Sequence, residues 1–118
     1  MNQKIEEKEK DNILLVSQII FKYLSPDFEK PYQTKYCKEF GLKYNLKSSI
    51  LVDYVSCIKK HRGINNRTFN ISQRNKEVIE FIAELTISEL ENLVYLNNLD
   101  RDFNLHTYLK EENNENKN

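Results

Sequence analysis

Apolar residues recur at helical spacing along most of the chain, and no segment alternates convincingly as a β-strand would. In residues 11–24, for example, Ile13, Val16 and Ile20 fall on one helical face. The chain has only two Gly and two Pro, so turns are few and the elements between them are long. At 118 residues it is large enough for a single core. We therefore expect an all-α fold, a compact single-domain bundle of five or six helices.

Cap and stop residues divide the chain into these helices. Pro26 ends the first, because the residue before a proline is pushed out of the helical region. Pro31 opens the second, and Gly41 is expected to stop it in a left-handed conformation. Thr86 and Glu89 form a capping box that starts a later helix. The expected helices span residues 11–24, 31–40, 48–62, 73–85, 87–99 and 101–110.

The expected domain covers residues 11–110. Residues 1–10 are strongly charged and are expected to be a flexible N-terminus or the solvated first turns of a helix. Residues 111–118 are acidic and rich in Asn, which predicts a disordered tail. Residues 63–71 are the clearest loop, and a short hairpin there would give a winged arrangement.

Charge is strongly segregated along the chain, although the net formal charge is zero. Residues 30–76, the basic segment, contain eleven Lys and Arg against two acidic residues, a formal charge of +9. Residues 1–29 carry −2 and residues 77–118 carry −7. Such asymmetry is typical of proteins that contact nucleic acid.

The first functional hypothesis is therefore a non-enzymatic protein whose basic central face binds RNA, DNA or a ribonucleoprotein, mainly through phosphate contacts. Two other interpretations remain open. The basic segment can form a protein-docking face, or it can be neutralised internally by the acidic C-terminal half. The candidate phosphate-binding residues are Lys35, Lys38, Lys43, Lys47, Lys59, Lys60, Arg62, Arg67 and Arg74.

Residues 31–62 outline a corner like a helix-turn-helix, with Gly41 in the turn. The second helix would present five residues to a major groove: Lys47, Ser48, Ser49, Val52 and Asp53. The match is weak, because the second helix is largely apolar and Asp53 would repel phosphate. Contact with the nucleic-acid backbone is therefore favoured over recognition of a base sequence.

Aromatic residues interleave with the Lys and Arg residues of the basic segment. Exposed rings can stack on unpaired nucleotide bases. Tyr32, Tyr36 and Phe40 follow helical spacing, a pattern more typical of a core stripe. Tyr44 and Phe69, in expected connections, are the better stacking candidates.

The helix expected at residues 87–99 is apolar nearly all round. It is either the central helix of the bundle or has a second face for a partner. The second interpretation places a protein interface at Leu93, Tyr95 and Leu96. It suggests an adaptor or inhibitor, for example a mobile-element product that blocks a host nucleoprotein as anti-CRISPR proteins do, or self-association through the same helix.

Metal binding and catalysis find little support. Cys57 and His61 are four residues apart on one expected helix, and Cys37 and His106 would have to complete a zinc site. The paired cysteine knuckle of structural zinc sites is missing. A Cys57–His61 nucleophile pair would lack an orienting group. We expect no enzyme activity, no metal and no cofactor.

No apolar run approaches the roughly 20 residues of a membrane span. The first ten residues are charged and lack the apolar stretch of a signal peptide. These features predict a cytoplasmic protein without membrane contact, whose two cysteines are reduced.

Overall fold

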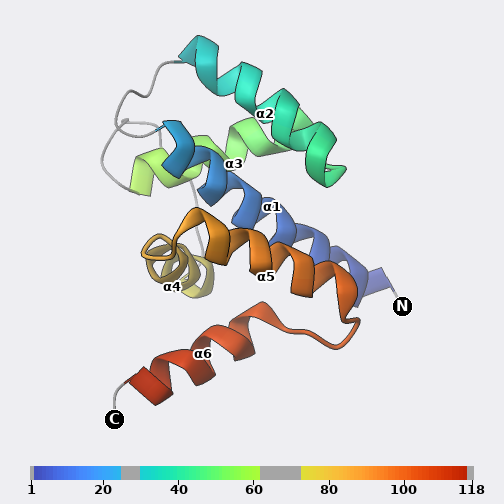
Figure 1. Cartoon of the computed structure of the whole chain (residues 1–118), viewed down its shortest axis with the longest axis vertical. Helices are drawn as coiled ribbons and strands as arrows, with labels where there is room; N and C mark the ends of the chain where they lie inside the picture. Colours follow the sequence, from blue (N-terminus) through green and yellow to red (C-terminus); the bar gives the residue numbers. More distant parts are fainter. Residues whose placement is uncertain (1, 25–29, 62–72, 117–118) are drawn as a thin grey trace.

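The computed structural model describes residues 2–24, 30–61 and 73–116, with side chains over 8–24, 33–61 and 76–111. Within these ranges the chain forms α-helices and no β-strand, which confirms the predicted all-α class (Figure 1). The compact globule measures 38 × 32 × 27 Å. The helices are α1 (Asn2–Leu24), α2 (Lys30–Tyr44), α3 (Ser48–His61), α4 (Gln73–Ile82), α5 (Ile87–Leu99) and α6 (Leu105–Asn116).

Helix α1 is the centre of the bundle. It packs against α2, α3, α4 and α5, and in Figure 1 it runs between the α2–α3 pair and α5. Its apolar residues at 13–16 and 19–21 lie on more than one side of the helix, so several helices can bury surface against it. The fully or almost fully buried apolar residues of α1 are Ile13, Leu14, Leu15, Val16, Ile19, Ile20 and Leu24.

Helix α5, which the sequence made a candidate for this central place, is buried on one side only. Leu90, Leu93 and Val94 are buried, whereas Tyr95 and Leu99 are 60% and 67% exposed. Its predicted bounds, residues 87–99, match the structure, and so does its capping box. The Thr86 hydroxyl accepts from the Glu89 amide at 3.1 Å, and the Glu89 carboxylate accepts from the Thr86 amide at 2.9 Å.

The predicted stop of α2 at Gly41 is wrong. The helix runs through Gly41 to Tyr44, and Asn45 takes the left-handed conformation with φ of 58°. The Leu46 amide donates to the Gly41 carbonyl at 2.7 Å, as in a Schellman motif. Gly41 itself is buried, and a Cβ there would lie 2.6 Å from the Leu46 carbonyl oxygen. Glycine is required for this close approach of the chain, while Asn45, four residues later, makes the turn.

Asn45 offers a matched pair of substitutions at the α2–α3 turn. Asn45→Gly is expected to keep or slightly raise the free energy of unfolding, because glycine adopts positive φ without a steric penalty. Asn45→Ala is expected to lower it by about 1 kcal/mol, because alanine has neither that freedom nor the short polar side chain. Urea unfolding of the two variants and the parent measures both changes. Equal stability of the two variants would contradict this account of the turn.

The other helix ends differ modestly from expectation. Helix α4 ends at Ile82 rather than at residue 85, and α6 begins at Leu105 rather than at residue 101. The Asn104 side chain accepts from the Thr107 amide at 2.9 Å, which caps α6 and fixes its start. Helices α1 and α6 also extend into residues 2–10 and 111–116, the two ends expected to be flexible. The winged hairpin considered for residues 63–71 lies outside the described residues.

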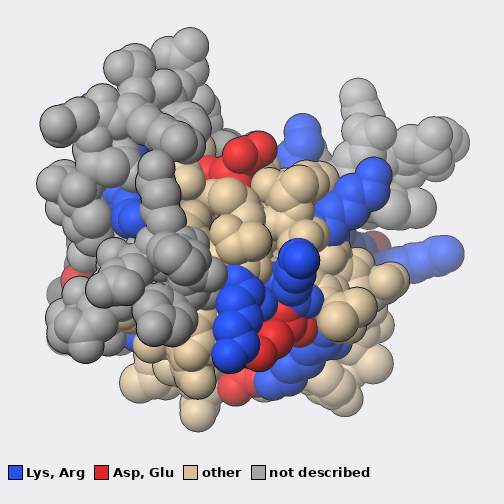
Figure 2. Space-filling view, turned by 90° about the horizontal axis from the view of Figure 1, so that it is seen from above, with Lys and Arg blue, Asp and Glu red and all other residues tan. Residues whose placement is uncertain are grey.

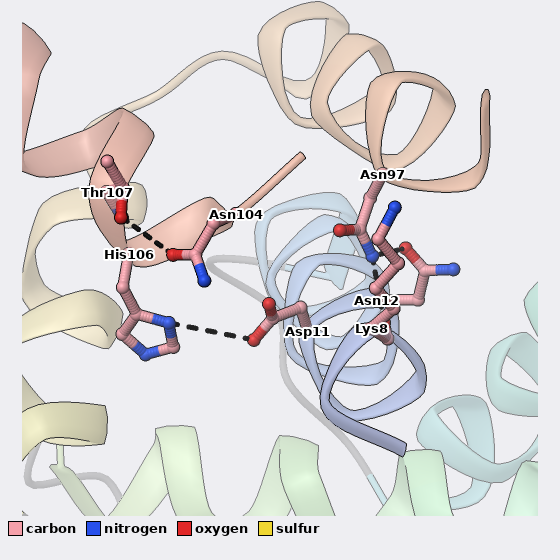
Figure 3. Close-up of polar contacts among 7 residues, drawn as sticks. All are labelled: Lys8, Asp11, Asn12, Asn97, Asn104, His106 and Thr107. Atoms are coloured by element: carbon pink, nitrogen blue, oxygen red, sulfur yellow. Dashed lines mark hydrogen bonds and ion pairs between the residues drawn. The ribbon is translucent and has the colours of Figure 1, made fainter. Parts of the chain in front are cut away.

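Amide side chains form a polar seam between α1 and the C-terminal half of α5 (Figure 3). The buried Asn97 amide donates to the Asn12 side-chain oxygen at 2.7 Å and to the Lys8 carbonyl at 2.8 Å. Asn12 in turn donates to the Asn98 side chain. The seam fixes how α5 lies along α1, because sliding either helix would separate buried donors from their acceptors.

None of the described helices combines the length and apolar character needed to cross a bilayer.

Candidate nucleic-acid interface

Four lysines of the basic segment on α2 and the turn that follows it are exposed, and one of them, Lys43, is ion-paired. Lys35, Lys38 and Lys47, the outer lysines, are all exposed. At about 100° per residue, Lys35 and Lys38 fall within roughly 60° of each other on the side of α2 opposite its buried Cys37. The α2 side of the molecule presents basic side chains, with acidic ones between some of them (Figure 2). Glu39 is the acidic residue that shares the outer side of α2.

Lys43 is partly neutralised. Its ammonium lies 3.0 Å from the Glu91 carboxylate on α5, and the Tyr44 hydroxyl donates to the same oxygen at 2.7 Å. These hydrogen bonds, first from Tyr44 and then from Lys43, lower the pKa of Glu91, and the contact raises the pKa of Lys43. This pair is an instance of the internal neutralisation considered from the sequence.

Lys59 is buried, with 7% of its surface exposed, although it was a candidate phosphate ligand. Its ammonium lies 3.5 Å from the Gln33 side-chain oxygen. The physical reason is its position four residues after the buried Val55, on the apolar side of α3. Its neighbour Lys60 is turned about 100° away and is half-buried. A phosphate therefore reaches Lys60 in this structure more readily than Lys59.

The arginines of the basic segment are not placed. Arg62 and Arg67 lie outside the described residues, and the side chain of Arg74 lies outside them too. The structure thus describes the side chains of six of the nine candidate residues, all of them lysines. Of these, Lys35, Lys38 and Lys47 are exposed, Lys43 is exposed but paired, Lys60 is half-buried, and Lys59 is buried.

The corner between α2 and α3 has a shorter connection than expected, because α2 extends to Tyr44 and α3 starts at Ser48. The two helices pack against each other. Lys47, Ser49 and Asp53 are exposed, and Val52 is half-buried, so the strip that would meet a major groove carries a carboxylate near its middle. The corner keeps the outline predicted from the sequence, two packed helices joined by a short turn.

Four aromatic rings from α1 and α2 pack together beside Lys35 and Lys43. Tyr23, Tyr36, Phe40 and Tyr44 form this aromatic cluster, with ring centroids 4.8 Å apart for Tyr23–Tyr36, 6.0 Å for Tyr23–Phe40 and 6.3 Å for Phe40–Tyr44. Tyr36 and Phe40, from the stripe expected to join the core, are half-buried against it. Tyr44, expected in a connection, is the last residue of α2 and is half-buried there too. Tyr23 is 54% exposed.

Tyr23 lies on α1, so no spacing pattern within α2 could connect it with Tyr36 and Phe40. Tyr44, a stacking candidate, holds its hydroxyl against Glu91. Tyr32 and Phe69, the other aromatic candidates, have no described side chain. The spacing of Tyr36 and Phe40 was the available signal, and the ring that completes their cluster comes from another helix.

The two histidines lie in different surroundings. His61 contacts Glu80 at 3.3 Å, whereas His106 lies 4.0 Å from Asp11 (Figure 3). Burial raises the pKa of the Cys37 thiol to about 11, and burial also raises the pKa of Cys57. Both thiols are thus disfavoured as thiolates, the form that binds metals and attacks substrates. Among described residues, no three His, Cys, Asp or Glu side chains are grouped to hold a metal ion.

The three residues of the predicted protein interface on α5 differ in their exposure to solvent. Leu93 is buried in the core, Leu96 is half-buried, and Tyr95 is exposed. Leu99 and Ile87, which the sequence did not single out, are exposed on the same helix.

Comparison of the sequence with protein-family models, with curated proteins and with solved structures gives no match.

Proposed function

We propose that this protein is a non-enzymatic binder of nucleic acid, or of the nucleic-acid channel of a ribonucleoprotein, through phosphate contacts from α2 and the α2–α3 turn. The observation that carries the proposal is that the +9 segment presents, besides the paired Lys43, three exposed lysines on α2 and the α2–α3 turn: Lys35, Lys38 and Lys47. Phosphate backbones attract such clusters, and binding releases condensed counterions.

The surroundings of the outer lysines support this role. In the described part of the chain, neither Lys38 nor Lys47 has an ion-pair partner within 4.0 Å, unlike Lys43. Lys35 lies 6.0 Å from the Tyr36 ring centroid, which leaves its charge available to an anion. Only Glu39 opposes these charges on the outer side of α2, so the local balance is positive.

The test is a triple charge reversal, Lys35→Glu, Lys38→Glu and Lys47→Glu. We expect it to weaken binding of a fluorescently labelled oligonucleotide by at least about a hundredfold at low salt, because three attractive contacts become repulsive. Fluorescence anisotropy titration measures the change. Reversing Lys59, by contrast, would place a carboxylate in a buried position and confuse binding with folding.

The matched control reverses the charge of three exposed basic residues outside the basic segment, with the substitutions Lys10→Glu, Arg101→Glu and Lys110→Glu. Both triple variants change the net charge by the same amount, so only the position of the charges differs. We expect the control to bind nearly as well as the parent. If both variants lose affinity alike, net charge alone decides binding and the proposed site is wrong.

A second candidate function is protein binding through α5, as an adaptor or an inhibitor of a nucleoprotein. The observation that favours it is the exposure of Tyr95 and Leu99 on one helix. A double variant, Tyr95→Ser with Leu99→Ser, is expected to lose a protein partner that the triple lysine variant retains. Affinity capture with the three proteins separates the two functions. A parent that sediments as a monomer and captures no partner would count against this candidate.

A further inference from the structure

We propose that the nucleic acid bound at this site is single-stranded, and that an unpaired base stacks on Tyr23 while its flanking phosphates meet the lysines of α2. The inference rests on the proposed function and assigns the class of ligand. It is carried by the aromatic cluster, in which the exposed Tyr23 ring packs against Tyr36 and Phe40, and Lys35 and Lys43 border the rings of Tyr36 and Tyr44.

The Tyr23 ring is held from one side. Its centroid lies 4.8 Å from that of Tyr36 at an interplanar angle of 60°, and 6.0 Å from that of Phe40 at 68°. Tyr23 nevertheless remains 54% exposed, the second most exposed aromatic residue after Tyr95 among those the structure describes. A ring that is held in this way loses little rotamer freedom when a ligand covers its outer face, so stacking on it is favoured.

Positive charge borders the cluster. The Lys35 ammonium lies 6.0 Å from the Tyr36 ring centroid, and the Lys43 ammonium lies 5.2 Å from that of Tyr44. Rings that alternate with cations match a single strand, whose bases and phosphates alternate along its length. Lys43 shares its charge with Glu91, so the Lys35 end of the cluster is the more strongly positive.

A duplex fits this surface less well. Its bases are stacked on one another and offer only their edges in the grooves, so a protein ring can reach a base face only at an end or a distortion. A single strand exposes base faces throughout. The exposed carboxylate Asp53 on α3 also argues against insertion of that helix into a groove.

The experiment compares labelled oligothymidine with a mixed-sequence duplex of equal length, by anisotropy at one salt concentration. Tyr23→Leu removes the ring and retains an apolar side chain against Tyr36, whereas Tyr23→Phe retains the ring. Tyr95→Leu is the control at an exposed tyrosine on α5. Thermal unfolding of each variant verifies that it is folded.

We expect the parent to prefer the single strand, and Tyr23→Leu to weaken single-strand binding by about five- to a hundredfold, the range for one stacked base. Tyr23→Leu should bind the duplex as the parent does. Tyr23→Phe and Tyr95→Leu should bind both oligonucleotides with nearly the affinity of the parent. Equal affinity for both oligonucleotides, or an unchanged Tyr23→Leu variant, overturns the stacking inference while lysine-dependent binding still stands. Failure of the parent to bind either oligonucleotide overturns the proposed function and this inference together.

Discussion

Replacing Leu15 by alanine is expected to lower the free energy of unfolding by about 2 to 5 kcal/mol, the largest single effect predicted for this chain. Leu15 is fully buried in the middle of α1, the helix that packs against four others. The truncation removes apolar contacts and leaves a cavity that the surrounding helices cannot readily close. Urea unfolding followed by circular dichroism measures the change, and the midpoint should fall.

Leu42 supplies the matched control. It lies on α2 and is 87% exposed, so Leu42→Ala makes the same chemical change in contact with water. We expect it to alter the free energy of unfolding by less than about 0.5 kcal/mol. If the two leucine variants lose equal stability, α1 is not the centre of the bundle and the packing described here is wrong.

The second large effect is expected at the polar seam. Asn97→Ala should lower the free energy of unfolding by about 2 to 4 kcal/mol, because one buried and one partly buried acceptor lose their donor. These acceptors are the Lys8 carbonyl and the Asn12 side-chain oxygen, 2.8 Å and 2.7 Å from the Asn97 amide nitrogen. The lost packing of a residue that is 1% exposed adds to the penalty.

Asn92, an exposed asparagine on the same helix, is the control for this prediction. Asn92→Ala removes the same side chain without uncovering buried acceptors, and alanine favours the helix slightly. We expect its stability to equal or exceed that of the parent. An Asn97→Ala variant as stable as Asn92→Ala would show that the seam does not hold α5 against α1.

Several features of the fold were predictable from local signals. The Thr86–Glu89 capping box gave the start of α5, because its two reciprocal hydrogen bonds depend only on residues three apart. Helical periodicity gave the fold class for the same local reason. Gly41 was misread because a glycine after an apolar stripe usually ends a helix, whereas here its missing Cβ admits the Leu46 carbonyl.

The candidate site was harder to predict, because neutralisation and burial depend on residues far away in the sequence. Lys43 meets Glu91 across 48 positions, and no spacing rule indicates that pair. The burial of Lys59, by contrast, could be predicted from spacing, because Lys59 lies four residues after Val55 on the same side of the helix. Tyr23 could be linked to Tyr36 and Phe40 only once the end of α1 was seen to lie against α2.

The most direct test of phosphate binding by this surface is the dependence of oligonucleotide affinity on salt. If Lys35, Lys38, Lys47 and Lys60 each meet one phosphate, the logarithm of the association constant should fall against the logarithm of salt concentration with a slope of about 3 to 4 in magnitude. The triple variant Lys35→Glu, Lys38→Glu and Lys47→Glu should lose most of that slope. Affinity that does not change with salt, or a slope that the triple variant retains in full, would contradict the proposal.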